Sequence, residues 1–176
     1  MTATGNVGSP AGDYPITCSG QSADNYEVKY VAGTLKVTKE DASIEYTGDT
    51  LVSLGSGSTT SVKLAGAIRE AADGTLGTKL TSTSLAFTVY KSSDATLSSP
   101  VGTCTGAVTS TRSGAGTASC NVSLGEDSYV VKIQLVTNGY YTAPIQDAAT
   151  TVATPGTGRT MGGGWLTDPP LKTRSN

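Results

Sequence analysis

Apolar and polar residues alternate along most of this chain, in short runs separated by clusters of Gly, Ser, Asp and Asn. Such period-2 alternation, rich in Thr and Val, is typical of β-strands that bury one face. The predicted strands in the main part of the chain are residues 42–46, 50–54, 60–68, 84–90, 102–109, 117–124, 129–136 and 148–153. A succession of short strands with turns between them predicts an all-β fold, an antiparallel β-sandwich.

Strand parity predicts which side chains form the core, because every second residue of a strand points to the same side of its sheet. The predicted inward rows are Leu85, Phe87 and Val89; Val122 and Leu124; and Tyr129, Val131, Ile133 and Leu135.

Residues 1–40 predict a small three-stranded β-meander ahead of the sandwich. Its strands are residues 14–18, residues 26–30, where apolar and charged residues alternate, and residues 35–37. A sheet this small, with one apolar face, is barely stable alone, so we expect it either to pack on another element or to be part of a larger domain.

One stretch of the predicted sandwich also carries a helical pattern. Between residues 63 and 76 the apolar residues recur at the spacing of an amphipathic helix, whereas residues 62–68 alternate as in a strand. Gly66 disfavours the helix by about 1 kcal/mol, and Asp73-Gly74 ends either element. We therefore expect a strand here.

The C-terminal part, residues 155–176, predicts a Gly- and Pro-rich linker followed by the start of a further module. Trp165, which is the only tryptophan, follows three glycines there. The alternative is an ordered tail whose Trp165 docks on the sandwich.

Composition narrows the possible chemistry. The 176 residues include 29 Thr, 20 Ser and 22 Gly but no His, which excludes Ser-His-Asp and Cys-His nucleophile systems and histidine metal sites. The formal net charge is −2 and the cations are scattered singly, so we expect no nucleic-acid partner. No apolar window is long enough to predict a membrane span.

The chain has three cysteines. Cys104 and Cys120 lie the same number of residues before and after Arg112, and the sequence of residues 112–116 predicts a turn. A hairpin centred there would place the two sulfurs opposite each other on adjacent strands, and a disulfide would stabilise the fold by about 3 kcal/mol and fit an oxidising compartment. The alternative is two buried thiols that pack as small apolar residues. Cys18 has no partner and is expected to be a buried thiol.

Other signals predict no cofactor or metal site. Residues 55–59 and 156–158 are Gly-rich but lack the Lys and Ser/Thr of a phosphate loop, so we interpret them as turns. The acids that could bind calcium, or act as a glycosidase pair, are Glu40, Asp41, Asp49, Glu126, Asp127 and Asp147. They show no alternating ligand run, and single acids in turns are usually solvated. We therefore expect no enzyme, cofactor or metal.

Tyr140 and Tyr141 are the one adjacent aromatic pair. On a strand one of the two must point outward, where it could stack on a sugar ring. The alternative is a structural role, in which an inward tyrosine ties down a neighbouring loop through its hydroxyl.

Part of the chain resembles a known family. The residues that carry the resemblance are 10–20 (PAGDYPITCSG), 25–26 (NY), 30–31 (YV) and 33–38 (GTLKVT). They are similar to the second half of the bacterial MBG repeat, a mostly-β, glycine-rich module that occurs in tandem in large surface proteins.

The following stretch resembles the Ig-like module that succeeds such repeats. The similar residues are 37–41 (VTKED), 46–48 (YTG), 62–64 (VKL), 73–74 (DG), 87–88 (FT) and 139–142 (GYYT). Residues 161–166 (MGGGWL) resemble the glycine-rich beginning of a further domain. The resemblance implies an Ig-like β-sandwich over residues 41–154, between a partial MBG-like module and a linker.

These families imply a function as well as a fold. Their modules are stalk or spacer units of exported bacterial proteins, so we expect a non-catalytic structural or adhesive segment at the cell surface, part of a longer chain. The expected partners are neighbouring Ig-like or MBG-like modules, with surface glycans or proteins as further candidates. The alternative is a carbohydrate- or ligand-binding module that uses Tyr140 or Tyr141.

Overall fold

The structure is a computed structural model of the chain, and it describes residues 2–5, 9–72, 79–136 and 139–156. Its strands are β1 (Thr2–Ala3), β2 (Gly12–Thr17), β3 (Gly33–Val37), β4 (Glu40–Tyr46), β5 (Leu51–Ser53), β6 (Thr60–Glu70), β7 (Ser84–Lys91), β8 (Pro100–Ala107), β9 (Thr109–Arg112), β10 (Ala115–Leu124), β11 (Asp127–Val136), β12 (Tyr141–Thr142) and β13 (Gln146–Ala153). A 3-10 helix, η1, spans Leu80–Ser82, and the described residues contain no α-helix.

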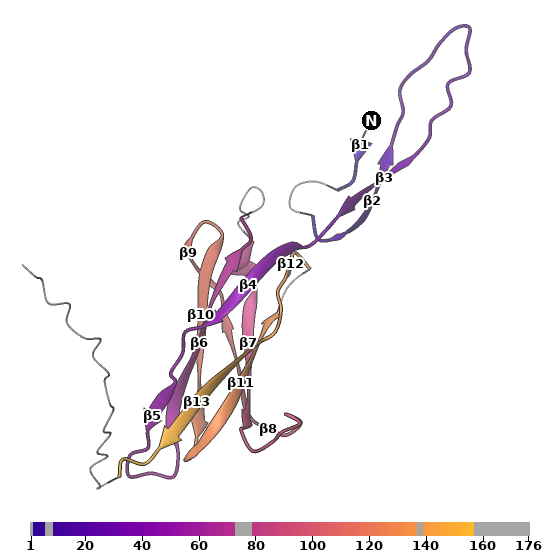
Figure 1. Cartoon of the computed structure of the whole chain (residues 1–176). Coiled ribbons are helices and arrows are strands. Elements are labelled where there is room, and N and C mark those ends of the chain that lie inside the picture. The colour runs from indigo at the N-terminus through magenta and orange to yellow at the C-terminus, as the bar shows by residue number, and fades with distance from the viewer. Residues whose placement is uncertain (1, 6–8, 73–78, 137–138, 157–176) are drawn as a thin grey trace, which may run out of the picture.

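The strands form three sheets. Two five-stranded sheets, ordered β12-β4-β6-β10-β9 and β5-β13-β11-β7-β8, pack face to face, and the small sheet β1-β2-β3 projects from one end of them (Figure 1). The prediction of an all-β sandwich is therefore confirmed. Most neighbours are antiparallel, but β12 pairs with β4, and β5 with β13, in parallel.

The core lies between the two large sheets, and the predicted inward rows form much of it. Phe87, Val131 and Ile133 are almost completely inaccessible, and the remaining residues of these rows are buried with them. Their partners come from β6, where Val62, Leu64 and Ile68 belong to the same apolar cluster. The alternation in the sequence thus reports burial between two facing sheets.

β6 confirms the strand that was expected over the competing helix. Its inward positions are buried along the whole strand, and Gly66 occupies one of them. A Cβ atom on Gly66 would lie 2.8 Å from the Leu85 Cδ1 atom of the opposite sheet. The glycine that weakens a helix here makes room for a core leucine.

The prediction of one strand over residues 102–109 is wrong. β8 ends at Ala107 and β9 begins at Thr109, and the two strands belong to different sheets. Val108 between them is buried. The covered positions of β8 alternate with exposed ones, and the buried Val108 and the exposed Thr109 continue this alternation, so the sequence pattern runs through the crossing without a break.

The predicted meander is partly wrong. β2 and β3 lie where strands were expected, but residues 26–30 lie in the loop between them and form no strand. The third strand is β1, which pairs with β2. The small sheet contacts the sandwich where the Ala11 N–H donates to the Gly139 carbonyl at 3.3 Å.

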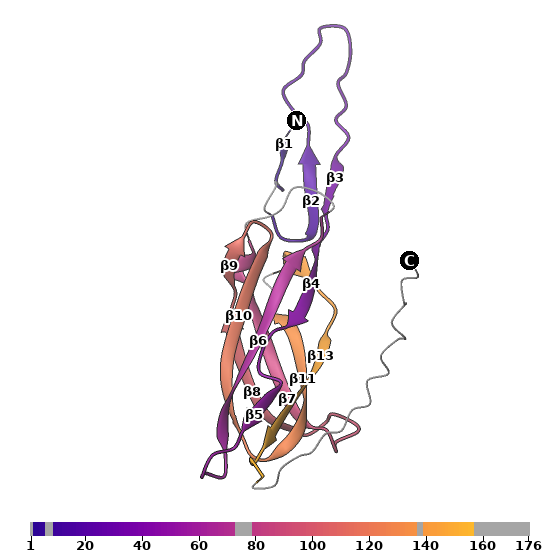
Figure 2. The ribbon, with the colours of Figure 1, turned by 60° about the vertical axis from the view of Figure 1, so that its left-hand side comes forward.

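The chain enters and leaves the sandwich at opposite ends. β4 begins at the end from which the small sheet projects, and β13 ends at the other end, beside β5 (Figures 1 and 2). There the Thr151 N–H donates to the Thr50 carbonyl at 3.0 Å, and the Leu54 N–H donates to the Ala153 carbonyl at 2.9 Å. The short parallel pair β5–β13 therefore joins the last strand of the sandwich, β13, to the strand that follows the first one, β4.

Candidate functional site

Two of the three cysteines form a covalent link within the sandwich. Cys104 on β8 and Cys120 on β10 form a disulfide, and their Cα atoms lie 6.1 Å apart. The predicted pairing is confirmed. Both cysteines are half-buried and pack against the core cluster.

The expected geometry of this disulfide is wrong. β8 and β10 do not form a hairpin, since β8 belongs to one large sheet and β10 to the other. The turn at residues 113–114 does exist, with Gly114 at a φ of 67°, but it joins β9 to β10. The disulfide therefore links the two layers of the sandwich rather than two neighbouring strands.

The two layers approach closely beside the disulfide. A Cβ atom on Gly106 of β8 would lie 2.6 Å from the Ser119 carbonyl oxygen and 2.8 Å from the Ser119 nitrogen on β10. Only a residue without a side chain fits at this distance. Gly106 thus permits the close approach of the same two strands that the Cys104–Cys120 disulfide links.

Tyr140 and Tyr141 differ in exposure. Tyr141 is 2 % exposed, and its hydroxyl donates to Glu70 Oε1 at 2.6 Å. Burial, and then the hydrogen bond to Glu70, raise the pKa of Tyr141 above its ordinary value of 10.0. Tyr140 is half-buried, with the Lys79 amine 5.6 Å from the centre of its ring. Tyr140 also packs against the core cluster, and of the two rings it is the one that keeps part of its surface exposed.

The Glu70–Tyr141 contact was not expected from the sequence. Glu70 is 8 % exposed and is the last residue of β6, so its hydrogen bond with Tyr141 joins the end of β6 to β12. A signal was present, because Glu70 has the same parity as the inward residues Val62, Leu64 and Ile68. A charged residue at an inward position predicts a buried polar partner.

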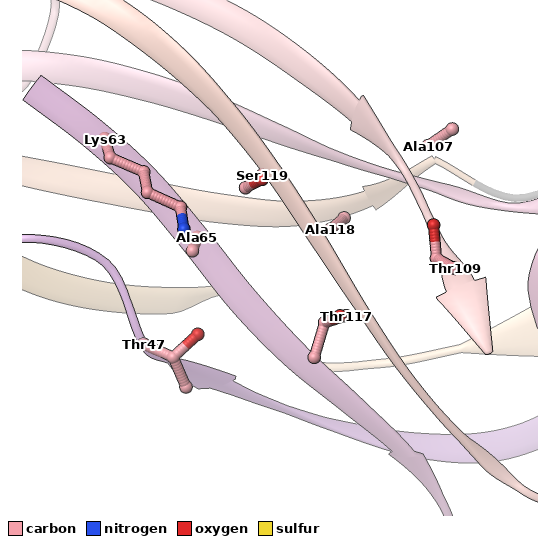
Figure 3. A pocket seen from close by; sticks show the side chains of 8 residues that line it. All are labelled: Thr47, Lys63, Ala65, Ala107, Thr109, Thr117, Ala118 and Ser119. Atoms are coloured by element: carbon pink, nitrogen blue, oxygen red, sulfur yellow. The ribbon is translucent and has the colours of Figure 1, made fainter. Parts of the chain in front are cut away.

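A shallow groove of about 380 Å³ lies on the outer face of β6 and β10 (Figure 3). Its lining residues are Thr47, Lys63, Ala65, Ala107, Thr109, Thr117, Ala118 and Ser119. The Lys63 side chain runs along β6, and its amine ends beside Ala65 (Figure 3). A second hollow of about 300 Å³ shares Thr117 and includes Arg69 and Arg112.

The chemistry of these two hollows is limited. The residues that line them offer hydroxyls, backbone groups and cations, but none is a carboxylate, a cysteine or an aromatic residue. General acid–base catalysis needs a group that exchanges a proton near neutral pH, and sugar binding usually needs an aromatic platform. The grooves therefore offer hydrogen-bond donors and acceptors but no aromatic platform for a sugar.

Three of the acids that were considered as calcium ligands bind other groups of the sandwich. Asp49 accepts the Lys63 N–H at 2.8 Å, and Glu126 accepts the N–H and the hydroxyl of Thr154. Asp127 pairs with Lys91 at 3.0 Å, and their hydrogen bond lowers the pKa of Asp127 and raises that of Lys91. In the described ranges no three Asp, Glu, Cys or His side chains are grouped so that they could hold a metal ion.

Asp94 organises the loop between β7 and β8. Its carboxylate accepts the N–H groups of Ser98 and Ser99, both at 2.9 Å, and the Thr96 hydroxyl at 2.8 Å. These donors, that of Ser99 foremost, hold the pKa of Asp94 below its ordinary range. The neighbouring Leu97 has a φ of 48°, so the loop follows a defined path.

The remaining sequence signals have plain locations. Residues 55–59 form an exposed loop between β5 and β6, as expected for a turn. Cys18 is a free thiol that is half-buried rather than buried. Trp165 and residues 157–158 lie outside the described residues.

The comparisons with known proteins support the predicted likeness of the N-terminal segment to the MBG repeat. A family model described as the MBG domain (YGX type) matches residues 1–36, which include β1, β2 and most of β3. The match covers the small sheet and not the sandwich, whose likeness to an Ig-like module stays a prediction. No curated protein matches the chain.

The only helix in the described part of the chain is η1, and no helix there is long and apolar enough to cross a membrane.

Proposed function

We propose that this chain is a non-catalytic structural module, a spacer or adhesive segment, of an extracellular bacterial surface protein. The expected partners are neighbouring MBG-like or Ig-like modules of the same longer chain. The match of residues 1–36 to the MBG domain supports a surface-protein role, because such domains occur in exported surface proteins. The disulfide is consistent with an oxidising compartment outside the cytoplasm.

The observation that carries this proposal is the parallel pairing of β5 with β13. β5 follows the strand by which the chain enters the sandwich, and β13 is the strand by which the chain leaves it. Tension applied at the two ends pulls parallel neighbours in opposite directions along their length. Their hydrogen bonds are then loaded together in shear, so several must break at once before the sandwich opens.

A force measurement tests this role. The full chain is held at its two ends and stretched as a single molecule, and we expect a discrete unfolding event. Thr151→Pro removes the N–H that bonds to Thr50, and it should lower the unfolding force. Ala149→Pro is the matched control, because it lies on the same strand outside the register with β5, which covers residues 151–153. Equal loss of force in both variants would contradict the load-bearing role of this pair.

Carbohydrate binding is the second candidate function, and it rests on Tyr140. This ring is half-buried against the core cluster and has the Lys79 amine over it, so a ligand would meet the exposed part of one aromatic ring and one hydrogen-bond donor. A glycan array with the parent chain and Tyr140→Ala tests it. Sugar binding that disappears with Tyr140→Ala and persists with Tyr141→Phe would support this function, and an array without signal would contradict it.

A further inference from the structure

Residues 26–30 have the sequence of a β-strand but no strand partner. Tyr26, Val28 and Tyr30 alternate with Glu27 and Lys29, and tyrosine and valine favour the pleated conformation. In the structure the segment belongs to the loop between β2 and β3 and pairs with no strand of the described chain. Its backbone is therefore able to pair with a strand from another molecule.

The same segment exposes its apolar side chains. Tyr26 is 81 % exposed and the adjoining Val31 78 %, while Val28 and Tyr30 also count among the exposed large hydrophobic residues. The loop reaches away from the sandwich (Figures 1 and 2), so nothing in the rest of the described fold covers it. A concentration of apolar side chains on one projecting loop is typical of an association surface.

The segment is complementary to itself. When two copies are placed antiparallel about a two-fold axis at Val28, Tyr26 of each copy lies opposite Tyr30 of the other. In the same register Glu27 lies opposite Lys29, twice. Aromatic pairs and pairs of opposite charge are the cross-strand combinations that stabilise antiparallel strands, and like charges opposite each other destabilise them.

We propose that two copies of this chain associate through residues 26–30, which form an antiparallel strand pair centred on Val28. The interface is isologous, since each contact occurs twice, and it therefore closes at a dimer. A second copy is the partner because the sequence Tyr-Glu-Val-Lys-Tyr, paired antiparallel with itself, places each Glu27 opposite a Lys29 and each Tyr26 opposite a Tyr30. This association goes beyond the spacer function and does not depend on it.

The loop is partly organised for this association. The Tyr30 hydroxyl donates to the Gln21 carbonyl at 2.7 Å and also accepts the Gln21 N–H. The two contacts join the arms of the loop near its base, which limits the freedom of residues 26–30. A segment that is already restrained loses less conformational entropy when it pairs.

Sedimentation of the full chain over a range of concentrations tests the proposal. All variants carry Cys18→Ser, so that the free thiol near the loop cannot cross-link two chains. We expect the mass to rise with concentration from 17.7 kDa toward that of a dimer. Glu27→Lys and Lys29→Glu each place like charges opposite each other, and each should weaken association roughly tenfold.

Two further samples make the test specific to the register. The double variant Glu27→Lys with Lys29→Glu restores opposite charges and should regain the association. A mixture of the two single variants should also associate, because one chain then has two cations and the other two anions at these positions. Glu45→Lys is the matched control, since Glu45 is an exposed glutamate on β4 and should change nothing.

The proposal is overturned by a mass that stays at one chain at every concentration. It is also overturned if the double variant and the mixture associate no better than the single variants, if Glu45→Lys weakens association as much as Glu27→Lys, or if growth continues beyond a dimer.

Discussion

The contact between Tyr141 and Glu70 shows how a single buried hydrogen bond holds β12 against the end of β6. The tyrosine hydroxyl donates to a carboxylate where both side chains are almost fully covered. Hydrogen bonds to charged groups stabilise a fold more than neutral ones, and removing one partner leaves the other with a desolvation penalty. The pair therefore serves as a structural tie within the sandwich.

Tyr141→Phe should destabilise the chain by about 1–3 kcal/mol, because it removes the hydroxyl and keeps the ring. Chemical denaturation measures the loss of unfolding free energy. Glu70→Gln retains an acceptor oxygen and should cost less. Tyr26→Phe is the control, since Tyr26 is 81 % exposed, and its effect should be close to zero. An equal effect of Tyr141→Phe and Tyr26→Phe would contradict the importance of this bond.

Thr150 should give the opposite result. Its side chain is 1 % exposed, and its hydroxyl has no hydrogen-bond partner among the described residues. A buried hydroxyl without a partner is unfavourable, so Thr150→Val, which has the same shape, should stabilise the chain by about 1 kcal/mol. Denaturation curves measure this gain. The control is Thr151→Val, at the neighbouring half-buried threonine. A loss of stability in Thr150→Val would show that the Thr150 hydroxyl is favourable to the fold.

At the level of elements, the disulfide and the crossing at Val108 act on the same strands. The chain passes from one sheet to the other between β8 and β9, and Cys104–Cys120 then fixes β8 to β10. This arrangement requires the backbones of β8 and β10 to approach closely at Gly106. The close approach can be tested separately from the disulfide.

Gly106→Ala should destabilise the sandwich by roughly 1–3 kcal/mol, because the added Cβ would lie 2.6 Å from a backbone oxygen of β10. The backbone cannot move aside as a flexible side chain can. Thermal unfolding measures the effect. Gly55→Ala is the matched control, since a Cβ there meets no atom within 4 Å. A Gly106→Ala protein as stable as Gly55→Ala would contradict the close approach.

Alternation predicted most strands because each has one face in the core. It failed at residues 26–30, where the pattern exists without a partner in the described chain, and at residues 102–109, where a buried crossing residue continues the pattern. β12, with two residues, is too short for any periodicity. The cysteine spacing predicted the pairing but not its geometry, since a hairpin and a link between sheets both satisfy it.

At the level of the whole molecule, buried tyrosines should govern the response to alkali. Burial raises the pKa of Tyr46 to about 12, with a further contribution from Asp49, and burial is also the first cause of the raised pKa of Tyr129 and Tyr141. A raised pKa in the folded state gives stability that is complete below the ordinary value of 10 and is lost as the pH rises beyond it.

We therefore expect these tyrosines to leave the unfolding free energy independent of pH below pH 10 and to lower it between about pH 10 and 12. Ultraviolet absorbance follows the ionisation of the eight tyrosines, and circular dichroism follows the fold. The three tyrosines with raised pKa values, Tyr46, Tyr129 and Tyr141, should ionise above pH 10, together with unfolding. Ionisation of Tyr46 and Tyr141 near pH 10 in a chain that is still folded would contradict their raised pKa values.

The Cys104–Cys120 disulfide fastens the two layers of the sandwich, and the proposed spacer role places tension between the two ends of the chain. The disulfide closes a segment with a sequence separation of 16 residues, whose extended length is about 50 Å. This segment cannot extend under force while the disulfide is intact. The most direct test is the extension of single chains pulled at their two ends, first oxidised and then reduced. We predict one discrete unfolding event in both states, with a length gain about 50 Å shorter in the oxidised chain. Gradual extension without a force peak, or the same length gain in both states, would contradict the account.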